Sequence, residues 1–321
     1  MCGIAGLANI KNSNFLIKDS QLDVLHKSID HRGPDGFGIW KSEKFEIAFV
    51  HRRLAIVDLS SAGYQPMLDD NNSVVISFNG EIYNHEIIRE QLESLGYKFN
   101  SRSDTEVIIY AYKQWGIDCI EKLEGMFAFS LFDLNKNELF LVRDRIGVKP
   151  LYFSLQDNIL SFASEIKALF SLDFINKNLS SQSVYHYLSY LVCPAPLTIY
   201  QDIYKLPAGY YLKLDSDKNI SFVNWYNALP RVSSVLCSSI RAQKNVSRDG
   251  DEGYYADKLL ELLDSSVKKR LMSDVPLGVF LSGGVDSSLL LGLMARHTDN
   301  LKSFNISFDV GGDYNEQKYA R

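Results

Sequence analysis

The sequence predicts an α+β region of two antiparallel sheets covered by helices, followed by the beginning of an α/β unit. Residues 1 to about 175 are rich in strand patterns with interspersed helices, and they lack the regular strand-helix alternation of a parallel sheet. From Tyr254 onward, a helix, a short apolar strand, a Gly-Ser loop, a second helix and a second strand follow in the order of a βαβ unit. The two patterns predict two different domains.

The 321 residues are enough for two domains that each bury a core. Residues 231–252 are rich in Ser, Arg and Lys and show little periodicity, which is typical of a linker or a surface insertion. We therefore expect domains at 1–215 and 253–321, with a linker or insertion at 216–252.

Periodicity and turn residues place the elements of the first domain in order. Ser103 or Asp104 is expected to cap the third helix. The expected strands are 1–10, 74–78, 127–134 and 138–143, the expected helices are 19–29, 86–95, 105–115 and 180–191, and a hairpin is expected over 203–214 with its turn at 207–209.

The second domain is expected to form one βαβ unit after an amphipathic helix. Leu259, Leu262, Leu263 and Val267 recur at helical spacing. The expected elements are helices over 255–271 and 289–297, a buried strand over 277–281 and a strand over 303–308.

Composition narrows the class of protein. The net charge of −5 and the lack of a basic run argue against a nucleic-acid partner. No signal peptide and no membrane-spanning apolar run are evident, so we expect a cytoplasmic protein without a membrane partner. Its four cysteines are scattered without a CxxC pair, which favours neither a disulfide scaffold nor a zinc site, and cytoplasmic thiols stay reduced.

Cys2 is a candidate nucleophile because of its position. Removal of Met1 would leave one residue that carries both a thiol and a free α-amine. An α-amine has a pKa of roughly 7.7–8.0, so part of it is a free base at neutral pH, and such a pair is the N-terminal form of nucleophilic catalysis. The alternative is a chance cysteine in a buried first strand.

Three further motifs carry residue types suited to amide chemistry. Arg53 lies at the end of an apolar segment, where its guanidinium suits a carboxylate, although a surface arginine is the alternative. Asn79-Gly80 follows a strand, so it indicates either a tight turn or an oxyanion hole. Asp104 is either part of a helix cap or a ligand for a substrate ammonium group.

A Gly-Ser loop between the last predicted strand and helix is suited to phosphate binding. Its glycines let backbone N–H groups approach phosphates, its serines add hydroxyl donors, and Asp286 offers a carboxylate to Mg²⁺. It lacks the lysine of a Walker A motif and the spacing of GxGxxG. The loop contains Ser282, Gly283, Gly284, Asp286, Ser287 and Ser288.

Taken together and in this order, the motifs closely resemble the glutamine-hydrolysing asparagine synthetase family. MCGIAGL, HRGPDG, HRRLAIVD, FNGEIYN, SDTE and DRIGVKPLY resemble a class II glutamine amidotransferase domain, and PLGVFLSGGVDSS resembles the pyrophosphate loop of ATP pyrophosphatases. The resemblance implies an N-terminal nucleophile hydrolase fold, with antiparallel sheets sandwiched by helices, followed by the beginning of an α/β ATP-pyrophosphatase domain.

The resemblance also implies roles for individual residues. Cys2 would attack the glutamine amide, with Asn79 and Gly80 stabilising the oxyanion. Arg53 would hold the glutamine carboxylate, and Glu81 and Asp104 would surround its ammonium group. Backbone groups of Arg53, Leu54, Ala55, Ile56 and Val57 would complete that pocket, and ATP would lie on the Gly-Ser loop between Leu281 and Ile306.

The implied overall reaction uses ATP with Mg²⁺ to activate aspartate, which ammonia from glutamine converts to asparagine. The alternatives are amidation of another carboxylate, such as a sugar uronate, and a glutaminase-only activity. The family's synthetase domain extends well beyond this loop whereas the sequence ends at Arg321, so we expect a C-terminally truncated chain. A homodimer is also expected.

Overall fold

The computed structural model describes residues 1–11, 15–43, 46–227, 252–307 and 317–320. Internal contacts divide the chain into two compact units, Met1–Leu229 and Pro230–Arg321. We describe each unit by itself.

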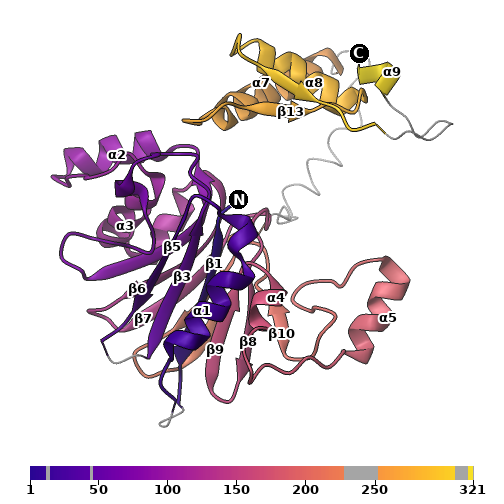
Figure 1. Cartoon of the computed structure of the whole chain (residues 1–321). Helices are drawn as coiled ribbons and strands as arrows, with labels where there is room; N and C mark the ends of the chain where they lie inside the picture. Colours follow the sequence, from indigo (N-terminus) through magenta and orange to yellow (C-terminus); the bar gives the residue numbers. More distant parts are fainter. Residues whose placement is uncertain (12–14, 44–45, 228–251, 308–316, 321) are drawn as a thin grey trace, which may run out of the picture. The chain divides into compact units, whose positions relative to one another are not determined.

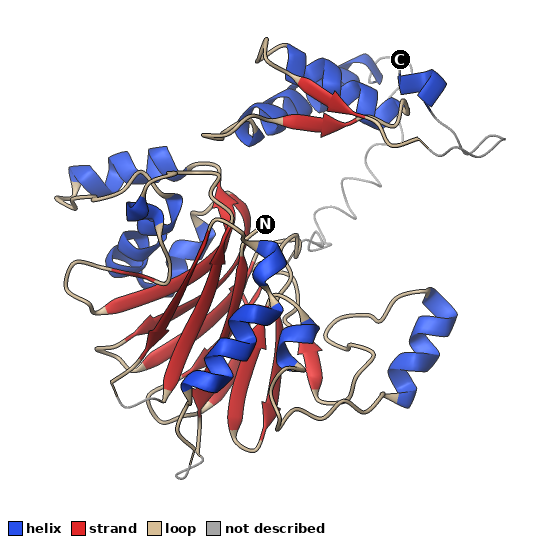
Figure 2. Cartoon of the chain, viewed as in Figure 1, coloured by secondary structure: helices blue, strands red, loops and turns tan. Residues whose placement is uncertain are grey.

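Two six-stranded antiparallel sheets form the first unit (Figures 1 and 2). The first has the order β10 (Ile203–Lys205), β8 (Tyr152–Gln156), β9 (Ile159–Ala163), β1 (Gly3–Asn9), β3 (Ile47–Arg53) and β2 (Gly36–Lys41). The second has the order β12 (Ile220–Asn224), β11 (Tyr210–Leu214), β7 (Glu138–Arg143), β6 (Gly125–Asp133), β5 (Val74–Ile82) and β4 (Met67–Leu68).

Helices cover the outer face of each sheet. The α-helices are α1 (Asp19–Ser28), α2 (His85–Ser94), α3 (Asp104–Trp115), α4 (Ile166–Leu169) and α5 (Ser181–Tyr190). Short 3₁₀ helices are η1 (Asp30–Arg32), η2 (Ser61–Gly63) and η3 (Gly116–Glu121). In Figure 1, α1 and α4 lie on the first sheet, and α2 and α3 lie on the second.

Three apolar clusters hold these layers together. One packs the first sheet against α1 and α4, one packs the second sheet against α2 and α3, and the third lies between the sheets. Strand β1 contributes alternately to two of them, since Ile4 and Ala8 face the other sheet while Ala5 and Leu7 face the helices. Burial on both faces explains why its sequence is a continuous apolar run, and the four layers confirm the predicted fold class.

Two sequence-based expectations at the end of this unit are wrong. Residues 203–214 do not form a hairpin: β10 pairs with β8 in the first sheet, whereas β11 pairs with β7 and β12 in the second. Residues 206–209 thus cross between sheets. Because β12 completes the second sheet, the first unit extends past the expected boundary at 215 to Leu229. Most of the expected linker, residues 228–251, lies outside the described residues.

The second unit contains the expected βαβ connection. Its elements are α7 (Glu252–Arg270), β13 (Gly278–Phe280), α8 (Val285–Ala295), β14 (Lys302–Phe304) and α9 (Gln317–Ala320). Strands β13 and β14 are parallel neighbours. Phe280 is 76% exposed, so the expected burial of this strand is not observed among the described residues. Helix α8 begins four residues earlier than expected, which places Asp286, Ser287 and Ser288 in its first turn.

No helix in the described part of the chain is both long and apolar enough to cross a membrane.

Candidate active site

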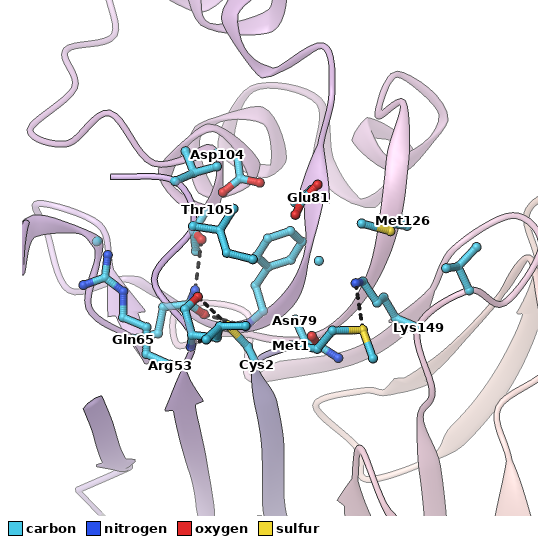
Figure 3. A pocket seen from close by; sticks show the side chains of 17 residues that line it. Met1, Cys2, Arg53, Gln65, Asn79, Glu81, Asp104, Thr105, Met126 and Lys149 are labelled. Atoms are coloured by element: carbon cyan, nitrogen blue, oxygen red, sulfur yellow. Dashed lines mark hydrogen bonds between the residues drawn. The ribbon is translucent and has the colours of Figure 1, made fainter. Parts of the chain in front are cut away.

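One cavity of about 280 Å³ gathers most of the sequence-predicted residues of the first unit (Figure 3). It opens where β1, β3, β5 and β6 meet the loops that follow β3 and β7. The expected residues that line it are Cys2, Arg53, Leu54, Ile56, Val57, Asn79, Gly80, Glu81 and Asp104. The unexpected ones are Met1, Gly63, Gln65, Phe78, Thr105, Met126, Val148 and Lys149.

The pairing of β1 with β3 positions the Cys2 thiol. Gly3 lies opposite Arg52 in the antiparallel register, so Cys2 meets the chain as it leaves β3. The Leu54 N–H donates to Cys2 Sγ over 3.3 Å, and Arg32 Nε donates to the Cys2 carbonyl oxygen over 2.9 Å. Both the side chain and the main chain of Cys2 are therefore fixed.

Burial acts on the thiol and on the chain's α-amine in opposite directions. It raises the pKa of the Cys2 thiol, against the effect of the Leu54 hydrogen bond. It lowers the pKa of the N-terminal amine, which in this structure belongs to Met1. A thiol in this setting needs a nearby base, and a partly desolvated amine is a suitable one.

Asn79 and Gly80 lie inside strand β5 and form no turn, because the strand continues to Ile82. The Asn79 side chain is buried, and among the described residues its Nδ2 has no hydrogen-bond partner. A buried amide without a partner is costly unless a ligand supplies one. At Gly80, a Cβ atom would lie 2.3 Å from the Met126 carbonyl oxygen, so the close approach of β6 requires glycine.

Asp104 and Glu81 give the cavity an acidic wall. Ser103 caps α3 by accepting from the Thr105 N–H over 3.1 Å, and Asp104, the first residue of the helix, lines the cavity. Asp104 Oδ2 accepts from the Ile82 N–H over 2.9 Å. Burial raises the pKa of Asp104 to about 6, and the nearby Glu81 charge adds to the shift.

The guanidinium of Arg53 is held by the loop that follows β3. Nη1 donates to the Ser60 carbonyl oxygen over 2.8 Å, Nη2 donates to that of Asp58, and the group lies 5.0 Å from the centre of the Tyr64 ring. Each terminal nitrogen of a guanidinium carries two N–H groups, so each can donate one hydrogen bond beyond the one that it gives to the loop. The arginine is 5% exposed and is thus not a surface residue.

Several supporting residues were not identified as such from the sequence. The HRGPDG motif holds the site in place: Arg32 binds Cys2, and Asp35 Oδ2 accepts from the Ala55 N–H over 2.8 Å. Ala55 does not line the cavity, contrary to expectation. The density of Gly, Pro and Asp in the motif indicated a rigid loop, but not its partners.

Gln65 is a second support, and no sequence signal indicated it. Its Oε1 accepts from the Phe78 N–H over 2.6 Å, and its Nε2 donates to Thr105 Oγ1 over 3.0 Å. Gln65 therefore ties the residue before Asn79 to the residue after Asp104.

In the second unit, the Gly-Ser loop joins β13 to the N-terminus of α8. Ser282 Oγ lies 3.0 Å from Ser287 Oγ, and Gly283 has a φ of +83°, which favours glycine. Asn305 Nδ2 donates to the Leu281 carbonyl oxygen over 2.8 Å. Leu281 is buried, whereas Ile306 is 69% exposed.

Asp286 is the one carboxylate expected to hold Mg²⁺. The described residues contain no group of three or more His, Cys, Asp or Glu that fits a metal ion. The side chains around Asp286 therefore do not form a metal site by themselves, and we derive no step through a metal.

Comparisons with known proteins match each unit to a protein family. Residues 1–226 match the model of the glutamine amidotransferase domain family, and residues 258–321 match that of asparagine synthase. The chain is 36% identical over 339 residues to "Putative asparagine synthetase [glutamine-hydrolyzing] 2" of Methanocaldococcus jannaschii, an alignment that covers 100% of this chain and 62% of the relative. It is 33% identical over 321 residues to "Asparagine synthetase [glutamine-hydrolyzing] 1" of Bacillus subtilis, covering 97% of this chain and 46% of the relative.

The chain spans about half the length of the curated relatives that it matches. Among solved structures, glutamine phosphoribosylpyrophosphate amidotransferase from B. subtilis aligns with a TM-score of 0.53 and 17% identity, over 96% of this chain and 67% of that chain. This likeness supports the N-terminal nucleophile hydrolase fold of the first unit.

Proposed function

The chain belongs to the glutamine amidotransferase family, and from this premise we propose that its first unit hydrolyses glutamine to glutamate and ammonia. The observation that carries the proposal is one cavity that holds the Cys2 thiol, the Asn79 amide, which has no partner among the described residues, and the acidic wall of Asp104 and Glu81. These groups match the amide, the developing oxyanion and the ammonium group of glutamine.

The reaction begins once Met1 has been removed and Cys2 carries the α-amine. The Cys2 sulfur attacks the side-chain amide carbon of glutamine while its proton passes to the α-amine. The carbonyl oxygen becomes an oxyanion, which Asn79 Nδ2 and the Gly80 N–H stabilise. The C–N bond then breaks, the α-amine returns the proton to the leaving nitrogen, and ammonia and a thioester result.

Water completes the turnover. The α-amine takes a proton from a water molecule that attacks the thioester carbon. The C–S bond then breaks and the amine returns this proton to the sulfur, which releases glutamate and regenerates the thiol and the free amine. Arg53 holds the α-carboxylate of the substrate, while Asp104 and Glu81 bind its ammonium group. Leu54, Ile56 and Val57 line the pocket beside it, and Ala55 supports them through Asp35.

For the second unit we propose ATP binding, with the phosphates on Ser282, Gly283, Gly284, Ser287 and Ser288 and the nucleoside beside Leu281 and Ile306. The exposed loop at the N-terminus of α8 supports this assignment, because free N–H groups there attract anions. Magnesium that accompanies ATP takes most of its ligands from phosphate and water, and Asp286 would contribute one more.

The names of the relatives support aspartate as the acceptor and asparagine, AMP and pyrophosphate as products with glutamate. A different carboxylate, such as a sugar uronate, and a glutaminase-only chain remain the alternatives. We also propose a cytoplasmic location, since Cys2 must stay reduced to act. The homodimer stays a prediction from the sequence.

The glutaminase proposal is tested by measuring glutamate release by the purified chain and its Cys2→Ala variant. We expect Cys2→Ala to abolish release, whereas Cys119→Ala, a buried cysteine of the second sheet's core, should keep it. Glutamate release by Cys2→Ala would refute the assignment. Incubation with glutamine, ATP and either aspartate or a uronate, followed by amide and pyrophosphate analysis, separates the ligase reactions from glutaminase alone.

A further inference from the structure

Lys149 places a buried ammonium group in the same cavity as the Cys2 thiol. The residue is 4% exposed, lines the cavity, and its Nζ lies 3.2 Å from Met1 Sδ (Figure 3). A thioether is a weak acceptor for an ammonium group. None of the ion pairs found between described residues includes Lys149. The charge with the largest effect on its pKa is that of Glu81, which lines the same cavity.

The loop that carries Lys149 is fixed on both sides of its main chain. Asp144 Oδ2 accepts from the Lys149 N–H over 2.9 Å, and its other oxygen accepts from the Val148 N–H over 2.9 Å. Arg143 Nε donates to the Lys149 carbonyl oxygen over 2.8 Å, and its Nη2 donates to that of Gly147 over 2.8 Å. This scaffold fixes the main chain of Lys149 at the cavity that Cys2 also lines, without using the lysine side chain.

Other charges also act on Cys2 and Lys149. Arg32 and Lys149 both lower the pKa of the Met1 α-amine, and the α-amine and Lys149 both lower the pKa of the Cys2 thiol. Arg32 is the second cation, and Glu165 neutralises it through a 2.8 Å ion pair while its Nε is bound to Cys2. The charged groups that act on the thiol, the N-terminal amine or Lys149 are Arg32, Lys149 and the N-terminal amine itself as cations and Cys2, Asp35, Glu81, Asp104 and Asp144 as anions.

We propose that the Lys149 ammonium, freed from its sulfur partner when Met1 is removed, provides the positive charge that keeps the thiol and α-amine of Cys2 ready to react. This inference rests on the proposed glutaminase function. Lys149 acts on Cys2 and need not touch glutamine.

One charge serves both groups because they ionise in opposite senses. A nearby cation lowers the pKa of a thiol by favouring the thiolate, and it lowers the pKa of an amine by disfavouring the protonated form. In this structure Lys149 offsets part of the burial that raises the pKa of the Cys2 thiol, and it adds to the burial that lowers the pKa of the Met1 α-amine. We expect the same direction for the α-amine of Cys2, because Met1, Cys2 and Lys149 line the same cavity. Without the Lys149 charge, both the thiol and the protonated amine lose their protons only at a higher pH.

The test compares the wild-type chain with Lys149→Met, which keeps the length and loses the charge, and Lys149→Arg, which keeps the charge. In glutamine hydrolysis, we expect Lys149→Met to move the acid limb of kcat/KM up by about one pH unit, a loss of about tenfold below that limb and little loss at high pH. Lys149→Arg should restore the wild-type midpoint. Lys122→Met, which removes an exposed lysine at Trp115, should not move it.

A second readout does not depend on turnover. The rate at which iodoacetamide alkylates Cys2, measured on the N-terminal peptide after intact mass has confirmed Met1 removal, should show a midpoint shifted to higher pH in Lys149→Met. If both profiles keep their midpoints, or lose amplitude equally at every pH, Lys149 is merely structural and the proposal is wrong. A chain whose Cys2→Ala variant still releases glutamate would refute the glutaminase assignment, while the alkylation profile would still decide the role of Lys149.

Discussion

The two candidate sites of this chain differ in how their polar groups are held. In the first unit, Asn79, Asp104 and Arg53 are at most 5% exposed. Asn79 lies within strand β5, Asp104 accepts from the Ile82 N–H of the same strand, and the loop after β3 holds Arg53. In the second unit, Ser282, Gly284 and Asp286 are exposed, and their contacts stay within the loop and the first turn of α8. The cavity of the first unit is therefore preorganised for charge development, whereas the Gly-Ser loop offers donors from an exposed surface.

This difference predicts that single substitutions in the cavity have larger effects than those in the loop. The sharpest case is Asn79→Ala, which removes an amide that has no other described partner. We expect kcat for glutamine hydrolysis to fall about 10²–10³-fold with little change in KM. Steady-state kinetics measure this, and a fall of less than threefold would remove Asn79 from the oxyanion site.

Asp104→Asn tests the acidic wall. We expect KM for glutamine to rise about tenfold or more, because the substrate ammonium loses a charged partner. In the wild type, KM should rise as the pH falls through about 6, where Asp104 takes up a proton. The variant should have a high KM without this pH dependence, and an unchanged profile would exclude Asp104 as the ammonium ligand.

The same variant should be more stable than the wild type at neutral pH. The folded pKa of Asp104 lies above its unfolded value, so its burial opposes folding fully above about pH 6, and this penalty disappears as the pH falls toward 4. Asparagine keeps an oxygen for the Ile82 N–H. Thermal unfolding at pH 7.5 and pH 4 measures the gain, which should shrink at the lower pH.

The same substitution at one glycine of each region, Gly80→Ala and Gly284→Ala, compares the stability cost in the two regions. Gly80→Ala forces a Cβ against the Met126 carbonyl oxygen, and we expect it to destabilise the protein by about 1–3 kcal/mol and to reduce glutaminase activity. At Gly284 the nearest atom to such a Cβ is Ser282 Oγ at 3.5 Å, so alanine there should cost about 0.5 kcal/mol or less. Chemical denaturation measures the free energy of unfolding of both variants. Equal losses of stability would contradict the predicted difference between the cavity and the loop.

The smallest effect is expected at Ser282. Because the loop is exposed and several donors share the phosphates, Ser282→Ala should weaken ATP binding only about two- to fivefold and leave glutamine hydrolysis unchanged. Equilibrium binding of ATP measures this. A loss as large as that of Asn79→Ala would show that the loop is also preorganised.

The sequence by itself determined the class of both units and most of the order of their elements, and it predicted most of the residues that line the candidate site. Strand β1 and helix α3 follow from local periodicity and caps. Residue type makes Cys2, Arg53, Asn79 and Asp104 candidates, and the resemblance of the ordered motifs to one family implies their roles. The sequence near each of these residues does not decide between its alternative roles. Asn79-Gly80 is compatible with a turn until β6 pairs with β5 beyond it, and Asp104 is compatible with a cap until Ser103 is seen to fill that role.

Tertiary structure alone decided which distant segments support the site and where its charges lie. Residues 203–214 divide between two sheets because β8 and β7 offer separate edges, which no period within the segment reveals. Arg32, Gln65 and Lys149 reach Cys2 or its neighbours from segments up to about 150 residues away, through hydrogen bonds and burial that exist only after the sheets pack. Sequence patterns record which face of an element is apolar, whereas the partners of a buried polar group are set by the fold.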